Sequence, residues 1–372
     1  MKGIISKISL FLLVFSILTP FFSLKAIAAS QDLSFKAKVI EVTDRATKTR
    51  EDGSDFIQQN LKLRALESVR KGEEFIYNGI SEIEVADSKV YKVGDRVFVD
   101  VFVDENGEEL VYVTEYDRSF SVYFLIALFV VVFIVIGKFK GLKSLISLIF
   151  SFLVIIKFII PQILAGNDPF IISLIGGIFI LGAIIYFTEG WNKKSHLALL
   201  SVLISLSLTL VLSIIFTNLT RLTGMAQEEA VYLIGLGGVI INFKGLLLAG
   251  MLIGAIGVLD DIIIGQIEAV ERIREANPNL SSKRLFGLAY KIGNTHLGTM
   301  VNTLFLTYAG AALPLLLIFS IGHASGFDLS RNLNSELITT EVVRTLVGSI
   351  GVMASMPIAT FFGAYGIKWT KR

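Results

Sequence analysis

The sequence predicts an α-helical polytopic membrane protein with about seven spans and a small extracytoplasmic all-β domain. Its composition is the first observation: of 372 residues, 53% are hydrophobic and only 18% are charged, whereas soluble domains carry about 25% charged residues. The second is that residues 119–366 contain apolar runs of about 20 residues, the length that crosses a bilayer. The third is that residues 30–118 hold 13 basic and 20 acidic residues, an ordinary soluble composition.

The N-terminus, residues 1–29, has the three parts of a secretory signal peptide. Lys2 and Lys7 form a basic region, residues 8–18 form an apolar core, and residues 26–28 fit a small-x-small cleavage site. An uncleaved signal anchor is the alternative interpretation. Either would carry the segment that follows out of the cytoplasm.

Residues 30–118 predict β structure. Apolar and polar residues alternate from Ser34 onwards, and further strands are predicted near 56–66 and 80–86. The stretch 96–116 predicts a hairpin, because valines occupy every second position from 97 to 103 and Asn106-Gly107 tolerates positive φ in a tight turn. Four to six short strands indicate a small barrel of the OB or a related type, with a structural or docking role.

Seven apolar segments are long enough to span the membrane. They are residues 119–137, 144–164, 169–188, 196–217, 244–265, 297–320 and 343–366. If residue 118 lies outside, the 266–296 loop and the 367–372 tail are cytoplasmic. The segments then predicted to be cytoplasmic hold 13 Lys and Arg residues, and the predicted outer loops hold two. This excess obeys the positive-inside rule and agrees with the N-terminal signal.

The segment "AVYLIGLGGVII", residues 230–241, is apolar but too short to span a bilayer. Counting it as a span would move the basic residues of 266–296 to the outside. We therefore expect a re-entrant or interfacial half-helix, whose glycines allow broken backbone that is buried in protein or lines a cavity.

Two adjacent carboxylates, Asp260 and Asp261, lie in the fifth predicted span, in "GVLDDIIIGQ". At 1.5 Å per residue, Asp260 lies about 24 Å along a helix that starts near Lys244, inside a hydrocarbon core about 30 Å thick. A charged Asp at mid-membrane costs roughly 2.5 to 3.5 kcal/mol. The functional interpretation is a site for an ion, a proton or a substrate, with Gln266 nearby. The alternative is an acidic helix end at the cytoplasmic interface. Because Asp261 shares a helix face with Gly265, Asp261 is slightly preferred as the site residue.

The next span, which includes "GNTHLGTMVNTLFLTYAG", carries a polar face. Thr299, Asn302 and Thr303 are predicted to line the wall opposite the acidic pair, and Asn294 and His296 begin this face. The alternative is helix–helix hydrogen bonding, for which membrane helices commonly use Thr and Asn side chains.

Other classes of function find little support. The chain has no Cys, which excludes disulfides and thiolate metal sites. Neither a nucleic-acid-binding motif nor a soluble catalytic motif such as HExxH or GxSxG is present. We expect no cofactor, no metal and no nucleic-acid partner, and an enzyme is the less favoured class.

Three stretches identify a resemblance: "GVLDD" at 257–261, "NTLFLTYAGAALPLLL" at 302–317 and "EVVRTLVGSIG" at 341–351. In this order and spacing they resemble the YibE/F-like family, and the resemblance takes in roughly residues 35–366. It implies a multi-pass protein of the bacterial cell membrane and carries over no reaction. The positions that match are Asp260, Asp261, Gln266, Asn302, Tyr308, Pro314, Glu341 and Arg344.

The leading hypothesis is a transporter or permease-like protein with an intramembrane acidic site for a cation, a proton or a small substrate. The second is a non-catalytic envelope scaffold, which docks a partner through its β domain or forms a homo-oligomer. The third, an intramembrane hydrolase, is disfavoured because adjacent acids point about 100° apart on one helix. Glu341, the other available acid, is predicted at the opposite membrane face, where Arg344 can pair with it.

Overall fold

The computed structural model describes residues 34–50, 53–80, 89–103, 107, 109–236, 241–324 and 333–366. They fall into two compact units, one ending at Val135 and the other beginning at Ile136. Each unit is described by itself. The predicted signal or anchor, residues 1–29, lies outside the described residues.

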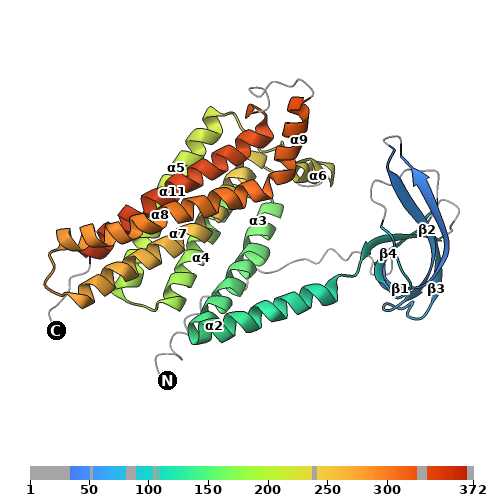
Figure 1. Cartoon of the computed structure of the whole chain (residues 1–372), viewed down its shortest axis with the longest axis horizontal. Coiled ribbons are helices and arrows are strands. Elements are labelled where there is room, and N and C mark those ends of the chain that lie inside the picture. Colours follow the sequence, from blue (N-terminus) through green and yellow to red (C-terminus); the bar gives the residue numbers. More distant parts are fainter. Residues whose placement is uncertain are drawn as a thin grey trace. The chain divides into compact units, whose positions relative to one another are not determined.

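The N-terminal unit is a five-stranded antiparallel sheet that curls into a half-barrel (Figure 1). Its strands are β1 (Ser34–Thr49), β2 (Asp55–Ala65), β3 (Glu74–Asn78), β4 (Arg96–Val103) and β5 (Glu109–Tyr116). The order is β3-β2-β1-β4-β5, so the long strand β1 pairs on both sides. Irregularities in the β1–β2 register after Val39 and Val42 bend the sheet, and β3 approaches β5. A closed barrel of the OB type stays a prediction.

Alternation along the strands builds the core of this unit. Val97, Val99 and Val101 of β4 are fully buried with β1 and β2 residues, whereas Val103 at the strand end is 60% exposed. Gly107 has a φ of +84°, which confirms that the β4–β5 connection needs a residue free to adopt positive φ. The strand predicted at 80–86 lies almost wholly outside the described residues.

Among the described residues, five helices are long and apolar enough to cross a membrane. They are the helical run Ser119–Leu164, α4 (Pro169–Thr188), α5 (Lys193–Leu219), α7 (Phe243–Ala276) and α11 (Glu336–Gly366). The run Ser119–Leu164 contains α2 (Ser119–Val154), the π-helix η2 (Ile155–Ile159) and α3 (Ile160–Leu164). Its single break is Lys138, with φ 49° and ψ −132°. The predicted spans 119–137 and 144–164 therefore correspond to two helical stretches, one on each side of this kink.

The predicted span 297–320 is divided between two helices. They are α8 (Ser282–Ala311) and α9 (Leu313–Ala324), and Ala312 between them leaves the helical conformation. Too few of the residues of α8 are apolar for it to be counted among the membrane-crossing helices. The predicted half-helix at 230–241 corresponds to α6 (Glu228–Leu236), and residues 237–240 are outside the described part.

The predicted loop 266–296 is helical except for a short turn at 277–281. α7 continues to Ala276 and stops before Pro278, and Ser281 caps α8 by accepting a hydrogen bond from the Arg284 N–H. This helical stretch has its own packing, and its cytoplasmic location stays a prediction. Val270, Leu285, Ala289 and Ala364 form a buried cluster that joins α7, α8 and α11.

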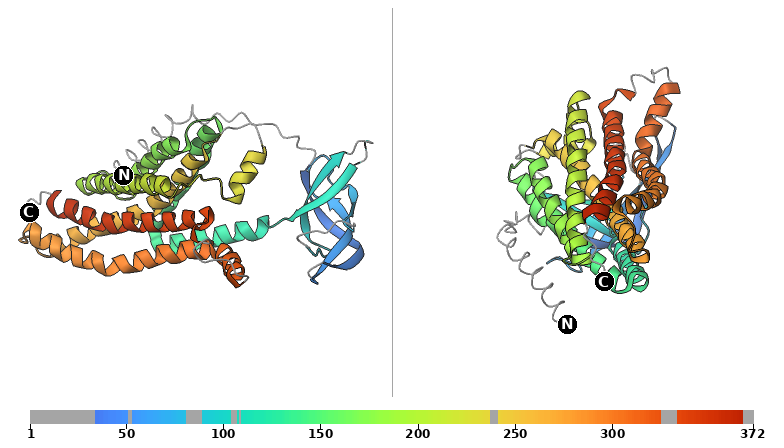
Figure 2. Two further views of the ribbon diagram at one scale, coloured as in Figure 1. Left: turned by 90° about the horizontal axis from the view of Figure 1, so that it is seen from above. Right: turned by 90° about the vertical axis from the view of Figure 1, so that its left-hand side faces the viewer.

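Helix α7 is the centre of the bundle and contacts α4, α5, α8 and α11, while α8 lies alongside α11 (Figure 2). Small and hydroxylated residues allow the helices to pack closely. A Cβ placed on Gly351 of α11 would lie 2.1 Å from the Thr209 hydroxyl of α5. The bundle core is apolar and includes Leu181, Val202, Leu252, Ile263 and Ala359.

Candidate functional site

Asp260 and Asp261 lie well inside the length of a membrane-crossing helix. The Asn242 amide before α7 donates a 2.9 Å hydrogen bond to Asp168, the N-cap of α4. Helices α4 and α7 therefore begin at the same level. They run in the same direction, because Gly177 of α4 lies next to Ile256 of α7 beyond these starts. The 20 residues of α4 span about 30 Å, and Asp260, 17 residues after Phe243, lies about 25 Å from the start of α7. The acidic pair is therefore within the hydrocarbon depth that α4 defines.

The two carboxylates have different surroundings. Asp260 is partly buried and Asp261 is exposed at the surface of the bundle, while Leu259 and Ile262 on either side of the pair are buried. Gly257 and Gly265 lie one turn before and one turn after Asp261, and a Cβ on either would meet no atom within 4 Å. We call this exposed face of α7, from Gly257 to Gly265, the open strip.

Neither aspartate forms an ion pair with any Lys, Arg or His in the part of the chain that the structure describes. The nearest charges along α7 are paired elsewhere. Glu268 and Glu275 contact Arg272, and Glu271 contacts Lys194 of α5. The charge of the acidic pair is therefore not compensated by a cationic side chain of the described residues.

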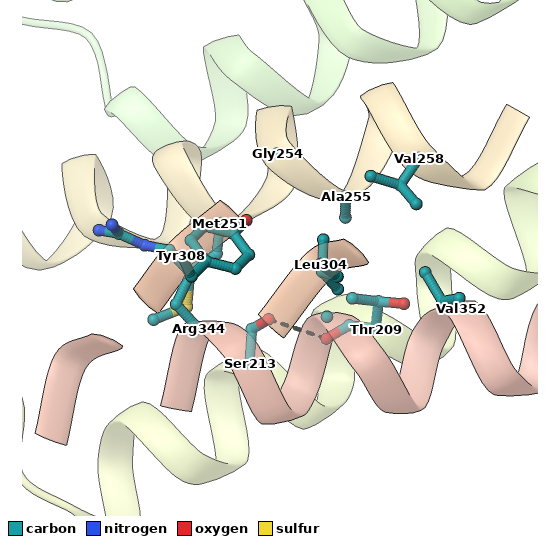
Figure 3. Close-up of a pocket in the computed structure, with 11 residues that line it drawn as sticks. Thr209, Ser213, Met251, Gly254, Ala255, Val258, Leu304, Tyr308, Arg344 and Val352 are labelled. Carbon is teal, nitrogen blue, oxygen red and sulfur yellow. Dashed lines mark hydrogen bonds between the residues drawn. The ribbon is translucent and has the colours of Figure 1, made fainter. Parts of the chain in front are cut away.

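A second polar feature is a small pocket between α5, α7, α8 and α11 (Figure 3). Tyr308 and Arg344 lie at one end, and Val258 and Val352 lie at the other. Arg344 donates to Glu341 at 2.8 and 3.2 Å, and its buried Nε has no hydrogen-bond partner among the described residues. The cavity measures about 10 Å³, which accommodates about one water molecule.

The pocket and the acidic pair are separate places on α7. The pocket is lined by Met251, Gly254 and Val258, and Asp261 follows Val258 by one turn. From Gly254, which makes room for the Tyr308 hydroxyl, to Asp261 the helix rises about 10 Å. The structure does not bring Glu341 to the aspartates as a second acid, because its partner Arg344 lines the far end of the pocket.

The other predicted site residues are distributed over two environments. Asn294, His296, Thr299, Asn302 and Thr303 of α8 are all exposed, and none of them lines the pocket. The Thr303 hydroxyl donates to the Thr299 carbonyl at 2.9 Å.

Gln266 is in the opposite situation, because only 5% of it is exposed. Its amide donates to the Ala289 carbonyl at 2.8 Å and to the Thr360 hydroxyl at 2.7 Å, and so connects α7 with α8 and α11.

The helical unit that holds these residues matches a known protein family. The sequence model of the YibE/F-like protein family matches residues 125–369. The chain belongs to the YibE/F-like family. No curated protein and no solved structure was found to match it. The family match covers the membrane helices and leaves out the β sheet, although the resemblance was expected to begin near residue 35.

Among the pocket residues that sequence reasoning missed in this YibE/F-like chain are two hydroxylated ones, Thr209 and Ser213 of α5. A signal was present, because hydroxylated residues recur every four positions on this helix, at Ser201, Ser205, Thr209, Ser213 and Thr217. All five are buried. Four of them donate to the carbonyl four residues earlier, which satisfies a hydroxyl inside a helix bundle.

Proposed function

We propose that the helical unit of this YibE/F-like protein binds a proton or a small cation at Asp260 and Asp261 and carries it across the membrane. The observation that supports this proposal is the position of two adjacent carboxylates inside the length of a membrane-crossing helix, without an ion pair in the described residues. Ionisable residues in such positions are rare and usually mark an ion or proton pathway.

The energetics favour a cationic ligand. A charged aspartate costs about 2.5 to 3.5 kcal/mol at mid-membrane and less nearer the interface, and two neighbouring negative charges also repel each other. A proton neutralises a carboxylate and a metal cation compensates it, so either ligand lowers this cost. An anionic ligand would increase the cost.

The geometry gives the two aspartates different roles in this proposal. Asp261 lies on the open strip, where a ligand reaches it without displacing side chains. Asp260 is partly buried beside it and adds negative charge. We therefore expect Asp261→Asn to reduce transport more than Asp260→Asn does.

Flux into proteoliposomes tests the proposal directly. The full-length protein is reconstituted, and an imposed pH gradient or a gradient of Na⁺, K⁺ or Mg²⁺ is followed with a fluorescent indicator. Glu275→Gln is the matched control, because Glu275 lies on the same helix but already pairs with Arg272 at 3.1 Å. We expect wild-type flux from the control and a loss of about tenfold or more from Asp261→Asn, equivalent to at least about 1.4 kcal/mol. Equal flux through Asp261→Asn and wild type would refute the proposal.

A scaffold function is the second candidate, and the β unit offers one observation in its favour. Phe102 and Tyr112, in an edge contact with ring centroids 5.7 Å apart, are exposed near one end of the β4–β5 pair, as are Val103 and Leu110. The excess of basic residues in alternate loops supports a location of this unit outside the cytoplasm. A scaffold predicts that Phe102→Ser with Tyr112→Ser abolishes cellular function while Asp261→Asn preserves it.

A further inference from the structure

Helix α8 lies at membrane depth although its mean hydropathy is too low for it to be among the membrane-crossing helices. Ala289 accepts a hydrogen bond from Gln266, and Tyr308 reaches Gly254, so the segment between them runs beside residues 254–266 of α7. Of these α7 residues, those from 254 to 263 lie within about 30 Å of the start of α7, the length that α4 spans. Thr299 and Asn302, which lie between Ala289 and Tyr308, are therefore surrounded by the hydrocarbon region.

The outward face of α8 differs from the other outward faces of the bundle. Exposed positions on α4 are Ile171, Ile175 and Ile178, and those on α5 include Val211 and Ile215. These are side chains that lipid solvates well. The corresponding face of α8 instead exposes Asn294, Thr295, Gly298, Thr299, Asn302 and Thr303, and becomes apolar only at Phe305 and Leu306.

Two of the three threonines of this face donate their hydroxyl hydrogens within the helix. Thr295 donates to Lys291 at 3.0 Å and Thr303 donates to Thr299 at 2.9 Å. The side-chain amide of Asn302, by contrast, makes no hydrogen bond within the described residues. An amide has two donor hydrogens and an acceptor oxygen, and lipid tails offer no partner for any of them. The face therefore requires a polar surface opposite it.

We propose that a second copy of this chain covers this face, with α8 packed against α8 about a two-fold axis. An amide is both donor and acceptor, so Asn302 and the same residue of the second copy complement each other across a two-fold axis. Gly298 lies one turn away on the same face, and a Cβ there would meet no atom within 4 Å, so two backbones approach closely. This inference does not depend on transport.

The first part of α2 is a poor partner for this face. The apolar first part of α2, residues 124–137, contains no hydroxyl, amide or charged side chain. It offers Asn302 nothing to bind. A second copy supplies the same amide and the same small residues at the same depth.

Cysteine cross-linking in native membranes tests the interface, because the chain contains no Cys of its own. Gly298→Cys and Asn302→Cys are introduced singly, and Ile178→Cys on the apolar face of α4 is the matched control. Disulfide formation requires Cα atoms about 4.4 to 6.8 Å apart. We expect oxidation to give a dimer, about twice 40.8 kDa, from positions 298 and 302 and only monomer from position 178.

A second measurement separates the interface from a misfolded variant. Asn302→Leu, purified as a monodisperse species, is expected to weaken association in liposomes about three- to tenfold, measured by energy transfer between labelled copies. Monomer alone from positions 298 and 302 would overturn the proposal. In that case, labelling of the two cysteines by a membrane-impermeant maleimide would show that a water-lined cavity covers the face. Absence of labelling would show that lipid or another segment covers it.

Discussion

Gln266→Leu distinguishes a ligand-binding residue from one that holds helices together. Gln266 is buried, and its amide donates to the Ala289 carbonyl at 2.8 Å and to the Thr360 hydroxyl at 2.7 Å. Leucine has a similar volume and leaves no large cavity, so the change removes mainly two hydrogen bonds. Thr360 keeps its own bond to the Met356 carbonyl at 2.7 Å, so that the Thr360 hydroxyl retains a partner.

The expected loss of stability follows from these two contacts. A side-chain hydrogen bond between membrane helices contributes about 0.6 kcal/mol on average and about 1.7 kcal/mol at most. Gln266→Leu should therefore lower the free energy of unfolding by about 1 to 3 kcal/mol. Thr360→Val removes the 2.7 Å hydrogen bond from Gln266 and the hydrogen bond to the Met356 carbonyl. It should lower the free energy of unfolding by a comparable or smaller amount. The two changes together should cost less than their sum, because they share one interaction.

Unfolding in detergent micelles with increasing SDS measures the stability, and proteoliposome flux measures the activity per folded molecule. We expect Gln266→Leu to unfold at lower SDS and to keep its flux once reconstituted. The reasoning would be refuted by a variant that unfolds like wild type but has lost its flux. That result would place Gln266 in the ligand site, as its position six residues after Asp260 suggested.

Two further predictions concern packing and acid stability. Gly351→Ala should lower the free energy of unfolding by about 1 to 3 kcal/mol, because the added Cβ would lie 2.1 Å from the Thr209 hydroxyl. Gly348→Ala is the control, since a Cβ there meets no atom closer than 3.6 Å. It should be neutral or stabilising by up to about 1 kcal/mol in the same SDS titration. Equal effects would contradict this packing. Hydrogen bonds from Lys89 and Arg118 lower the pKa of Glu115 from 4.5 to about 2. Its contribution to the stability of the β unit should therefore be complete above pH 4.5 and disappear as the pH falls to about 2, and Glu115→Gln should remove this part of the change in melting temperature.

Much of the architecture could be predicted from the sequence, because hydrophobic length and turn chemistry are local properties. The span predicted at 169–188 has the same bounds as α4, and the span predicted at 196–217 lies within α5. A run of about 20 apolar residues is sufficient to indicate such helices, whatever surrounds them. The β4–β5 hairpin was predicted for a similar reason, since Gly107 tolerates a positive φ that other residues rarely adopt.

The candidate site depended on contacts that no local pattern contains. The sequence determined that Asp260, Asp261 and Gln266 lie on one membrane helix. Only the tertiary structure decided that Asp261 is exposed on the open strip while Gln266 is buried among three helices.

The same holds for α8 and for the pocket. The sequence predicted one span at 297–320, and the tertiary structure divides that stretch between α8 and α9 and packs α8 against α7 and α11. The pocket combines residues of four helices that are far apart in the sequence. The physical reason is that each residue turns about 100° around its helix, so that exposure and partners depend on which neighbouring helix lies on that side.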